Sequence, residues 1–179
     1  AFAALEGTFS LYLQERFGWN ASDAAYAFAA LGLVSAMVQG GLIRRLVPRF
    51  GEARLLVVGI ATLGAGLAGM ALVGTSGALV AALFVVGVGQ GISNPSVQGL
   101  LSRRTPASEQ GAIFGVLSSA QTLARMTNYL VANRLLRLGP SAPYWEGAAL
   151  AAFALVLAVA AVGAGSSRKP PIVAESVYE

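Results

Sequence analysis

The chain has 179 residues, of which 56% are hydrophobic and 11% are charged. Soluble domains contain about 45–50% apolar and about 25% charged residues, so this composition argues against a water-soluble fold. The chain has no Cys and no His, which excludes disulfides, thiol nucleophiles, the usual zinc sites and Ser-His-Asp triads, and its net charge of +4 comes from dispersed basic residues rather than from a nucleic-acid-binding stripe.

Long apolar runs follow one another along the chain. A bilayer core takes about 17–25 helical residues. Five runs reach that length, and they cover residues 24–46, 55–73, 77–101, 112–136 and 148–164. A shorter apolar run, 2–13, precedes them. We therefore predict an all-α integral membrane protein, an antiparallel bundle of six transmembrane helices over residues 1–165. Residues 166–179 are predicted to form a polar, disordered cytoplasmic tail.

The first run, 2–13, starts without a basic leader or an initiator Met. We expect it to be a helix truncated at its start, and the chain to be either part of a longer polypeptide or a separate subunit. By these boundaries Glu6 is the only acidic residue within an apolar run. It is thus the obvious partner for a cation at membrane depth, or a carrier of protons.

Basic residues gather in the connections of one side. With alternating helices, one face holds eight of them: Arg44, Arg45, Arg49, Arg54, Arg103, Arg104, Arg168 and Lys169. The other face holds Arg16, Arg134 and Arg137. The positive-inside rule predicts that the first face and the C-terminus are cytoplasmic. Trp19, Tyr144 and Trp145 are expected in outer connections, where an aromatic belt forms.

Small residues are frequent inside the apolar runs. The stretch Gly87-Val88-Gly89-Gln90-Gly91 has Ile92 where a dinucleotide-binding turn needs its third Gly, and no βαβ unit surrounds it. We therefore interpret these glycines as points of close helix packing.

Polar side chains at depth concentrate in the runs 77–101 and 112–136, the fourth and fifth of the six predicted helices. Arg125 lies about midway along its run, where an ionised group is costly unless it is paired or wetted. We hypothesise that Glu6 and Arg125 face a common polar cavity. The alternative is that Arg125 caps carbonyls of a neighbouring helix while Glu6 reaches the outer interface. The neutral amides are Gln90, Asn94, Gln98, Gln121 and Asn128, and they either orient an amphiphilic ligand or link helices.

Several stretches resemble the major facilitator superfamily. The segment GLIRRLVPRFGEAR (41–54) is similar to its cytoplasmic loop motif, carried here by Gly41, Arg45, Arg49, Gly51 and Arg54, although Arg44 and Pro48 replace the leading Gly and the Asp. The stretches SNPSVQGLLS (93–102), EQGAIFGVLS (109–118), PYWEG (143–147) and EGTFSLYLQERFGW (6–19) resemble the C-terminal half of tetracycline-type drug:proton antiporters. RMTNY (125–129) stands where that subgroup often has a Gly-Pro pair after the Arg.

The resemblance implies the C-terminal six-helix half of a bacterial inner-membrane exporter, which is not an enzyme and uses no metal or cofactor. Such a half would exchange protons for a small organic compound by alternating access. Its expected partners are the lipid bilayer, the missing N-terminal half or another membrane subunit, and a small-molecule substrate. The alternative is a non-transporting membrane scaffold or accessory subunit derived from a half carrier.

Overall fold

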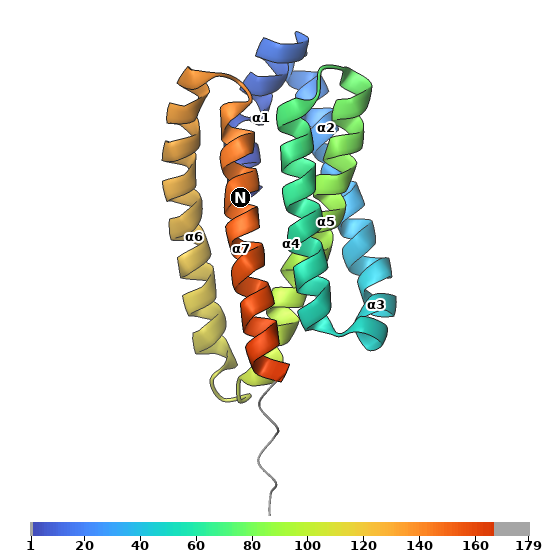
Figure 1. Cartoon of the computed structure of the whole chain (residues 1–179), viewed down its shortest axis with the longest axis vertical. Helices are drawn as coiled ribbons and strands as arrows, with labels where there is room; N and C mark the ends of the chain where they lie inside the picture. Colours follow the sequence, from blue (N-terminus) through green and yellow to red (C-terminus); the bar gives the residue numbers. More distant parts are fainter. Residues whose placement is uncertain (1, 167–179) are drawn as a thin grey trace, which may run out of the picture.

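The computed structural model describes residues 2–166, and this part of the chain contains helices and no strand (Figure 1). Its elements are α1 (Phe2–Phe17), α2 (Ala21–Met37), the π-helical turn η1 (Val38–Leu42), α3 (Ile43–Phe50), α4 (Glu52–Leu72), α5 (Ser76–Arg104), α6 (Gln110–Leu135), the 3-10 turn η2 (Leu136–Leu138) and α7 (Ala142–Ser166). Because α2, η1 and α3 run on without a break, the described chain forms six rods. The predicted all-α bundle of six helices is confirmed.

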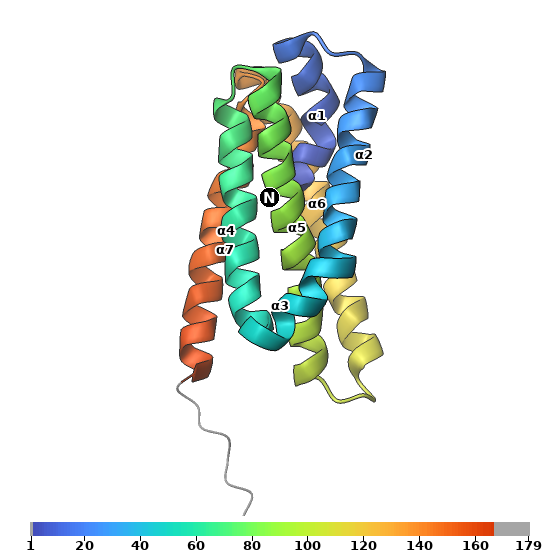
Figure 2. The same cartoon turned by 90° about the vertical axis from the view of Figure 1, so that its right-hand side faces the viewer.

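Successive rods run in opposite directions. The turn at Gly51, the turn between α5 and α6 and the end of α7 lie at one end of the bundle, and the other three connections lie at the opposite end (Figures 1 and 2). Arg103 Nε lies 2.8 Å from Glu52 Oε1 across the first of these ends. The basic clusters of 44–54 and 103–104 therefore share one end, as predicted. Arg168, Lys169 and the rest of the expected tail lie outside the described residues, except for Ser166, which ends α7.

Within residues 2–166, four rods are long and apolar enough to cross a membrane: Ala21–Phe50, Glu52–Leu72, Ser76–Arg104 and Ala142–Gly163. The shorter α1 has 16 residues, as its short apolar run predicted. With 26 residues, α6 has the length of a span, but its composition is more polar. The expectation of five full apolar runs is thus met by four; the exception is α6, which carries Gln121, Arg125 and Asn128.

Helix starts agree with most of the local signals in the sequence. Asn20 accepts from the backbone N–H of Asp23 while Asp23 accepts from that of Asn20, a capping box that begins α2. The short connection 73–75 separates α4 from α5. Pro106 lies in the turn that precedes α6, which begins at Gln110.

The segment 41–54 is largely helical rather than a loop. Gly41 belongs to η1, Arg45 and Arg49 belong to α3, and Arg54 lies in the first turn of α4. Gly51 alone of the five motif residues sits in the turn, with a φ of 74° that favours glycine. The rod is longer than its hydrophobicity predicts because polar residues extend it past the apolar run.

The start of α7 was placed too late by the apolar pattern. The helix begins at Ala142, so Tyr144 and Trp145 lie in its first turn and not in a connection. Tyr144 is completely buried, with its ring centroid 4.5 Å from that of Tyr12. The expectation that Tyr144 belongs to an interfacial aromatic belt is therefore wrong, because the ring fills the core between α1 and α7. Trp145 is half-exposed.

Glycines allow the central helices to approach closely. A Cβ on Gly66 of α4 would lie 2.8 Å from the backbone nitrogen of Val86 in α5, and a Cβ on Gly91 would lie 2.8 Å from Cβ of Val38. Ser35 Oγ donates to the carbonyl of Gly87, which joins α2 to α5. These contacts support the interpretation of the glycines as packing positions, and the most extensive packing in the bundle is that of α4 against α5 and α7.

Two side chains of α1 cap the C-terminal end of α4. The buried Tyr12 hydroxyl donates to the carbonyl of Met70 at 2.6 Å. One turn later, Arg16 donates through Nε and Nη2 to the carbonyl of Val73. The last carbonyls of a helix lack partners within the helix, and a cation there also complements the helix dipole. The short α1 is thereby fixed to the turn between α4 and α5.

We expect Tyr12→Phe to lower the free energy of unfolding of the complete protein by about 1–3 kcal/mol. The ring packing would remain, while the buried carbonyl of Met70 would lose its donor. Thermal unfolding in detergent would measure the change, with Tyr26→Phe as a control because Tyr26 is exposed. Equal melting temperatures for the two variants would contradict the capping role.

Candidate functional site: a polar cavity inside the bundle

A cavity of about 950 Å³ opens between α4, α5, α6 and α7, beside the start of α1. Its apolar wall includes Phe2, Ile60, Leu63, Leu150 and Ala154. Its polar groups are Gln90, Ser93, Asn94, Gln121, Arg125, Thr127, Asn128 and Glu146. An apolar cleft with a few converging polar groups is the usual form of a site for a small organic molecule.

The structure brings together five of the seven residues that the sequence singled out for a substrate or proton pathway. Gln90 and Asn94 come from α5, and Gln121, Arg125 and Asn128 come from α6. Glu6 contacts this group from α1 through Arg125. Gln98 is exposed and does not line the cavity, since it lies further toward the end of α5.

Glu6, Arg125 and Tyr129 form one cluster between α1 and α6. Arg125 Nη1 lies 3.7 Å from Glu6 Oε2, and the Tyr129 hydroxyl donates to the same oxygen at 3.0 Å. Gly7 allows this approach, because a Cβ there would lie 2.7 Å from Cδ1 of Tyr129. Glu6 and Arg125 are thus neighbours, but only Arg125 lines the cavity, so the hypothesis that both face it remains a prediction. Among the described residues, no backbone carbonyl accepts a hydrogen bond from Arg125, in contrast to the capping alternative.

A second acidic residue, Glu146, lines the cavity and was missed. The late start assigned to the last helix left Glu146 in a connection, whereas the structure places it inside the span Ala142–Gly163. Its Oε1 accepts a hydrogen bond of 2.7 Å from Nδ2 of Asn128. Glu6 is thus not the only acidic residue in an apolar helix. The signal that could have found Glu146 is Pro143, which favours the first turn of a helix.

The neutral polar side chains divide between the two roles left open by the sequence. Asn128 links α6 to α7 and is buried. Thr122 and Thr127 return hydrogen bonds to Ser118 and Leu123 of their own helix, as expected for hydroxyls in α6. Gln90, Asn94 and Gln121 line the cavity, where their amides face space that a ligand could fill.

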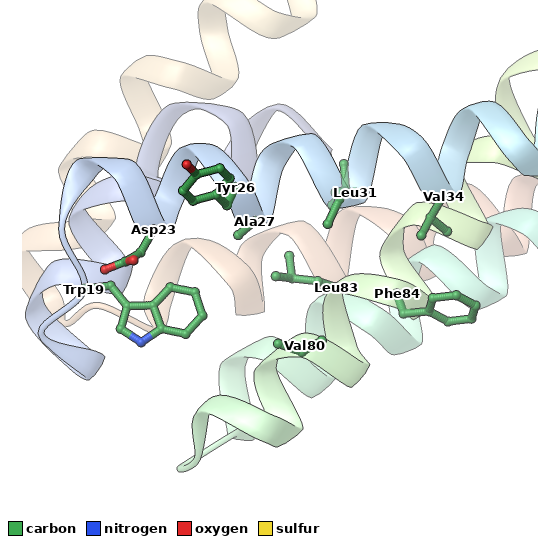
Figure 3. Close-up of a pocket in the computed structure, with 10 residues that line it drawn as sticks. Trp19, Asp23, Tyr26, Ala27, Leu31, Val34, Val80, Leu83 and Phe84 are labelled. Carbon is green, nitrogen blue, oxygen red and sulfur yellow. The ribbon is translucent and has the colours of Figure 1, made fainter.

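A separate groove of about 460 Å³ runs between α2 and α5 (Figure 3). Trp19 and Asp23 lie at one end, and Val34 and Phe84 lie at the other. The Asp23 carboxylate already caps α2, and the remaining wall is mostly aliphatic and aromatic. This groove offers apolar contact with few recognition groups, so the cavity between α4 and α7 is the better candidate for ligand chemistry.

Apolar helices of bilayer length, arranged around a cavity that carries amides and charges, define a multi-pass helical membrane protein with a polar site at membrane depth. Residues 1–176 match the sequence profile of the Major Facilitator Superfamily. The chain belongs to this family, and its six rods correspond to one half of the family fold.

Curated relatives extend the comparison. Tetracycline resistance protein class B of Escherichia coli is 28% identical over 137 residues, which are 76% of this chain and 33% of that protein. Class G of Vibrio anguillarum is 30% identical over 137 residues, 76% of this chain and 34% of that protein. A multi-drug resistance efflux pump PmrA homolog of Lactococcus lactis is 32% identical over 107 residues, 60% of this chain and 26% of that protein. The matched part of the chain thus spans about a quarter to a third of the length of these relatives.

Proposed function

We propose that the chain is the C-terminal half of a secondary transporter that exports a small organic compound or drug in exchange for protons. The transporter would reside in a bacterial inner membrane, with the basic end of this bundle and the C-terminus in the cytoplasm. The observation that carries the proposal is the cavity: charged and amide side chains converge inside a bundle that belongs to a family of carriers.

The cavity wall suits an amphiphilic ligand. Aliphatic and aromatic side chains from α1, α4 and α7 offer apolar contact, while amides from α5 and α6 can donate and accept hydrogen bonds. Polar groups at membrane depth are costly and are retained where a transported solute or ion passes. Relatives that are named as tetracycline resistance proteins support a drug-like substrate.

The exposed face of α6 supports a second half as the partner. Large apolar side chains outside the cavity lining have no cover from the bundle: Val116, Met126 and Leu130 are each at least 62% exposed. The same helix carries Gln121 and Arg125, which line the cavity. A lipid-facing helix would not carry these polar groups at depth, so a further set of helices closing the cavity agrees better with this surface.

The test is transport by the complete protein in everted membrane vesicles. With an imposed pH gradient, we expect vesicles carrying the complete protein to accumulate tetracycline or ethidium above the level of vesicles without it, and a protonophore should remove the difference. A carrier of this kind needs six further helices in the same polypeptide or complex. A complete protein with neither the further helices nor accumulation of any drug tested would instead favour a scaffold or accessory subunit.

A further inference from the structure

A carboxyl–amide pair joins α6 to α7 at the wall of the cavity. Asn128 Nδ2 donates to Glu146 Oε1 at 2.7 Å. The other oxygen of each group, Asn128 Oδ1 and Glu146 Oε2, is buried, and within residues 2–166 neither has a hydrogen-bond partner. Buried polar atoms normally have partners, so two unpartnered oxygens on one bonded pair call for an explanation.

A single proton would satisfy both oxygens. A primary amide and a carboxylic acid are planar groups that can form a ring with two hydrogen bonds, one in each direction. The amide N–H to Glu146 Oε1 is present, and a proton on Oε2 would supply the missing donor toward Asn128 Oδ1. With an ionised carboxylate, neither group could offer a donor to either of these two buried oxygens. If the oxygen and nitrogen of the Asn128 amide were exchanged, one amide oxygen and one carboxylate oxygen would still lack a donor.

The charges around Glu146 point the same way. From α6, Arg125 lines the cavity, but Glu6 of α1 already balances its charge at 3.7 Å. Arg16 of α1 is bound to the carbonyl of Val73 and to Ser141, and α4 contributes the apolar Ile60 and Leu63 to the cavity wall. Arg137 lies in η2, next to the start of α7. An ionised Glu146 would therefore add a carboxylate to a cavity whose lining arginine is already paired.

Glu6 is in the opposite situation. Its Oε2 accepts a hydrogen bond from the Tyr129 hydroxyl and lies 3.7 Å from Arg125 Nη1. Glu146 has a partner that can accept a proton-mediated hydrogen bond and no cation of its own among the described residues. The two carboxyl groups therefore have different partners: Glu6 has an arginine and a tyrosine hydroxyl, whereas Glu146 has an amide.

We propose that Glu146, held by Asn128, is the proton-binding group of the cavity. The protonated acid closes the ring with the amide; loss of the proton to cavity water opens the ring and leaves a carboxylate at the junction of α6 and α7. This inference rests on the proposed function for its role in coupling, but the protonated pair itself is independent of any substrate.

The test is infrared difference spectroscopy of the complete protein in lipid, recorded through a pH titration without substrate. We expect a carbonyl band of a protonated carboxyl group that disappears at high pH and that is absent in Glu146→Gln. Gln preserves both hydrogen bonds of the ring, so this variant should fold. Asn128→Leu should move the band to higher frequency, because a carbonyl that loses a hydrogen bond absorbs there. Glu15→Gln is the matched control, since Glu15 is exposed on α1.

Two results would overturn the proposal. One is a titrating band that survives in Glu146→Gln and vanishes in Glu6→Gln. The other is the absence of any carbonyl band of a protonated carboxyl group assignable to Glu146. That result would mean that Glu146 is ionised and that water donates hydrogen bonds to its carboxylate. Transport adds a separate readout: Glu146→Gln should exchange labelled tetracycline across the membrane but should not accumulate it against a gradient. A wild-type protein that binds the proton but transports nothing would refute the proposed function and leave this inference standing.

Discussion

Gly89→Ala is expected to destabilise the complete protein strongly. Gly89 of α5 packs directly on the backbone of α4: a Cβ there would meet Leu63 N and would lie 2.7 Å from Leu63 Cα. These atoms belong to a helix backbone, so the contact can be relieved only if α4 and α5 separate. Overpacking of a tight core costs about 1–3 kcal/mol, and more where no side chain can move aside. Thermal unfolding followed by size-exclusion chromatography in detergent would show the loss as a lower melting temperature or as aggregation.

Gly115→Ala is the matched control for this prediction. Gly115 also lies inside a long helix, but a Cβ there would meet nothing within 4 Å in this bundle. Ala is preferred over Gly in a helix by about 1 kcal/mol, so the control should be unchanged or slightly more stable. Gly66→Ala should resemble Gly89→Ala, since it meets the backbone nitrogen of Val86 at 2.8 Å. Equal behaviour of Gly89→Ala and Gly115→Ala would contradict the packing described for α4 and α5.

The helices themselves could be predicted because hydrophobic length alone identifies a membrane span. The predicted run 55–73 and α4 (Glu52–Leu72) differ by a few residues at most, as do 77–101 and α5 (Ser76–Arg104). The errors occur where polar residues continue a helix beyond its apolar part. Pro143 and Glu146 lie in the first turns of α7, before the predicted start at 148, and Arg49 lies in α3, after the predicted end at 46. Amino-acid composition identifies the part of a helix that lipid can surround. The residues at which the helix begins and ends depend on capping and packing.

The sequence could predict most of the residues that form the candidate site, but it could not predict which of their side chains contact one another. Arg125 and the amides stand out because polar side chains are rare in apolar helices. Which of them meet depends on the rotation of α6 against α1 and α7, and the sequence alone does not contain that rotation. The meeting of Glu6 with Arg125 could be proposed because few charges lie at depth. The pairing of Asn128 with Glu146 could not, because Glu146 fell outside the assigned span.

Arg125→Ala is expected to abolish transport while leaving the melting temperature nearly unchanged. The ion pair with Glu6 is partly accessible, with 53% and 28% of the two side chains exposed in this bundle, so it contributes about 0–1 kcal/mol to folding. During transport, however, an unpaired Glu6 carboxylate would remain beside the cavity with Tyr129 as its donor. An unpaired carboxylate within the membrane is costly, so it would raise the free energy of the closed conformation through which the loaded carrier must pass. Drug accumulation in everted vesicles, measured beside thermal unfolding, separates the two effects.

The double variant Glu6→Gln with Arg125→Gln tests whether the charge pair or the arginine alone matters. Removing both charges should recover part of the transport lost in Arg125→Ala, because the new amide in α1 could still accept from Tyr129 and no unpaired charge would remain. Arg134→Ala is the control, since Arg134 is an exposed arginine of the same helix. If Arg125→Ala transports as well as Arg134→Ala, the cluster of Glu6, Arg125 and Tyr129 only positions α1 against α6. If the double variant is as inactive as the single one, the guanidinium itself contacts the substrate, because relieving the charge on Glu6 then restores nothing.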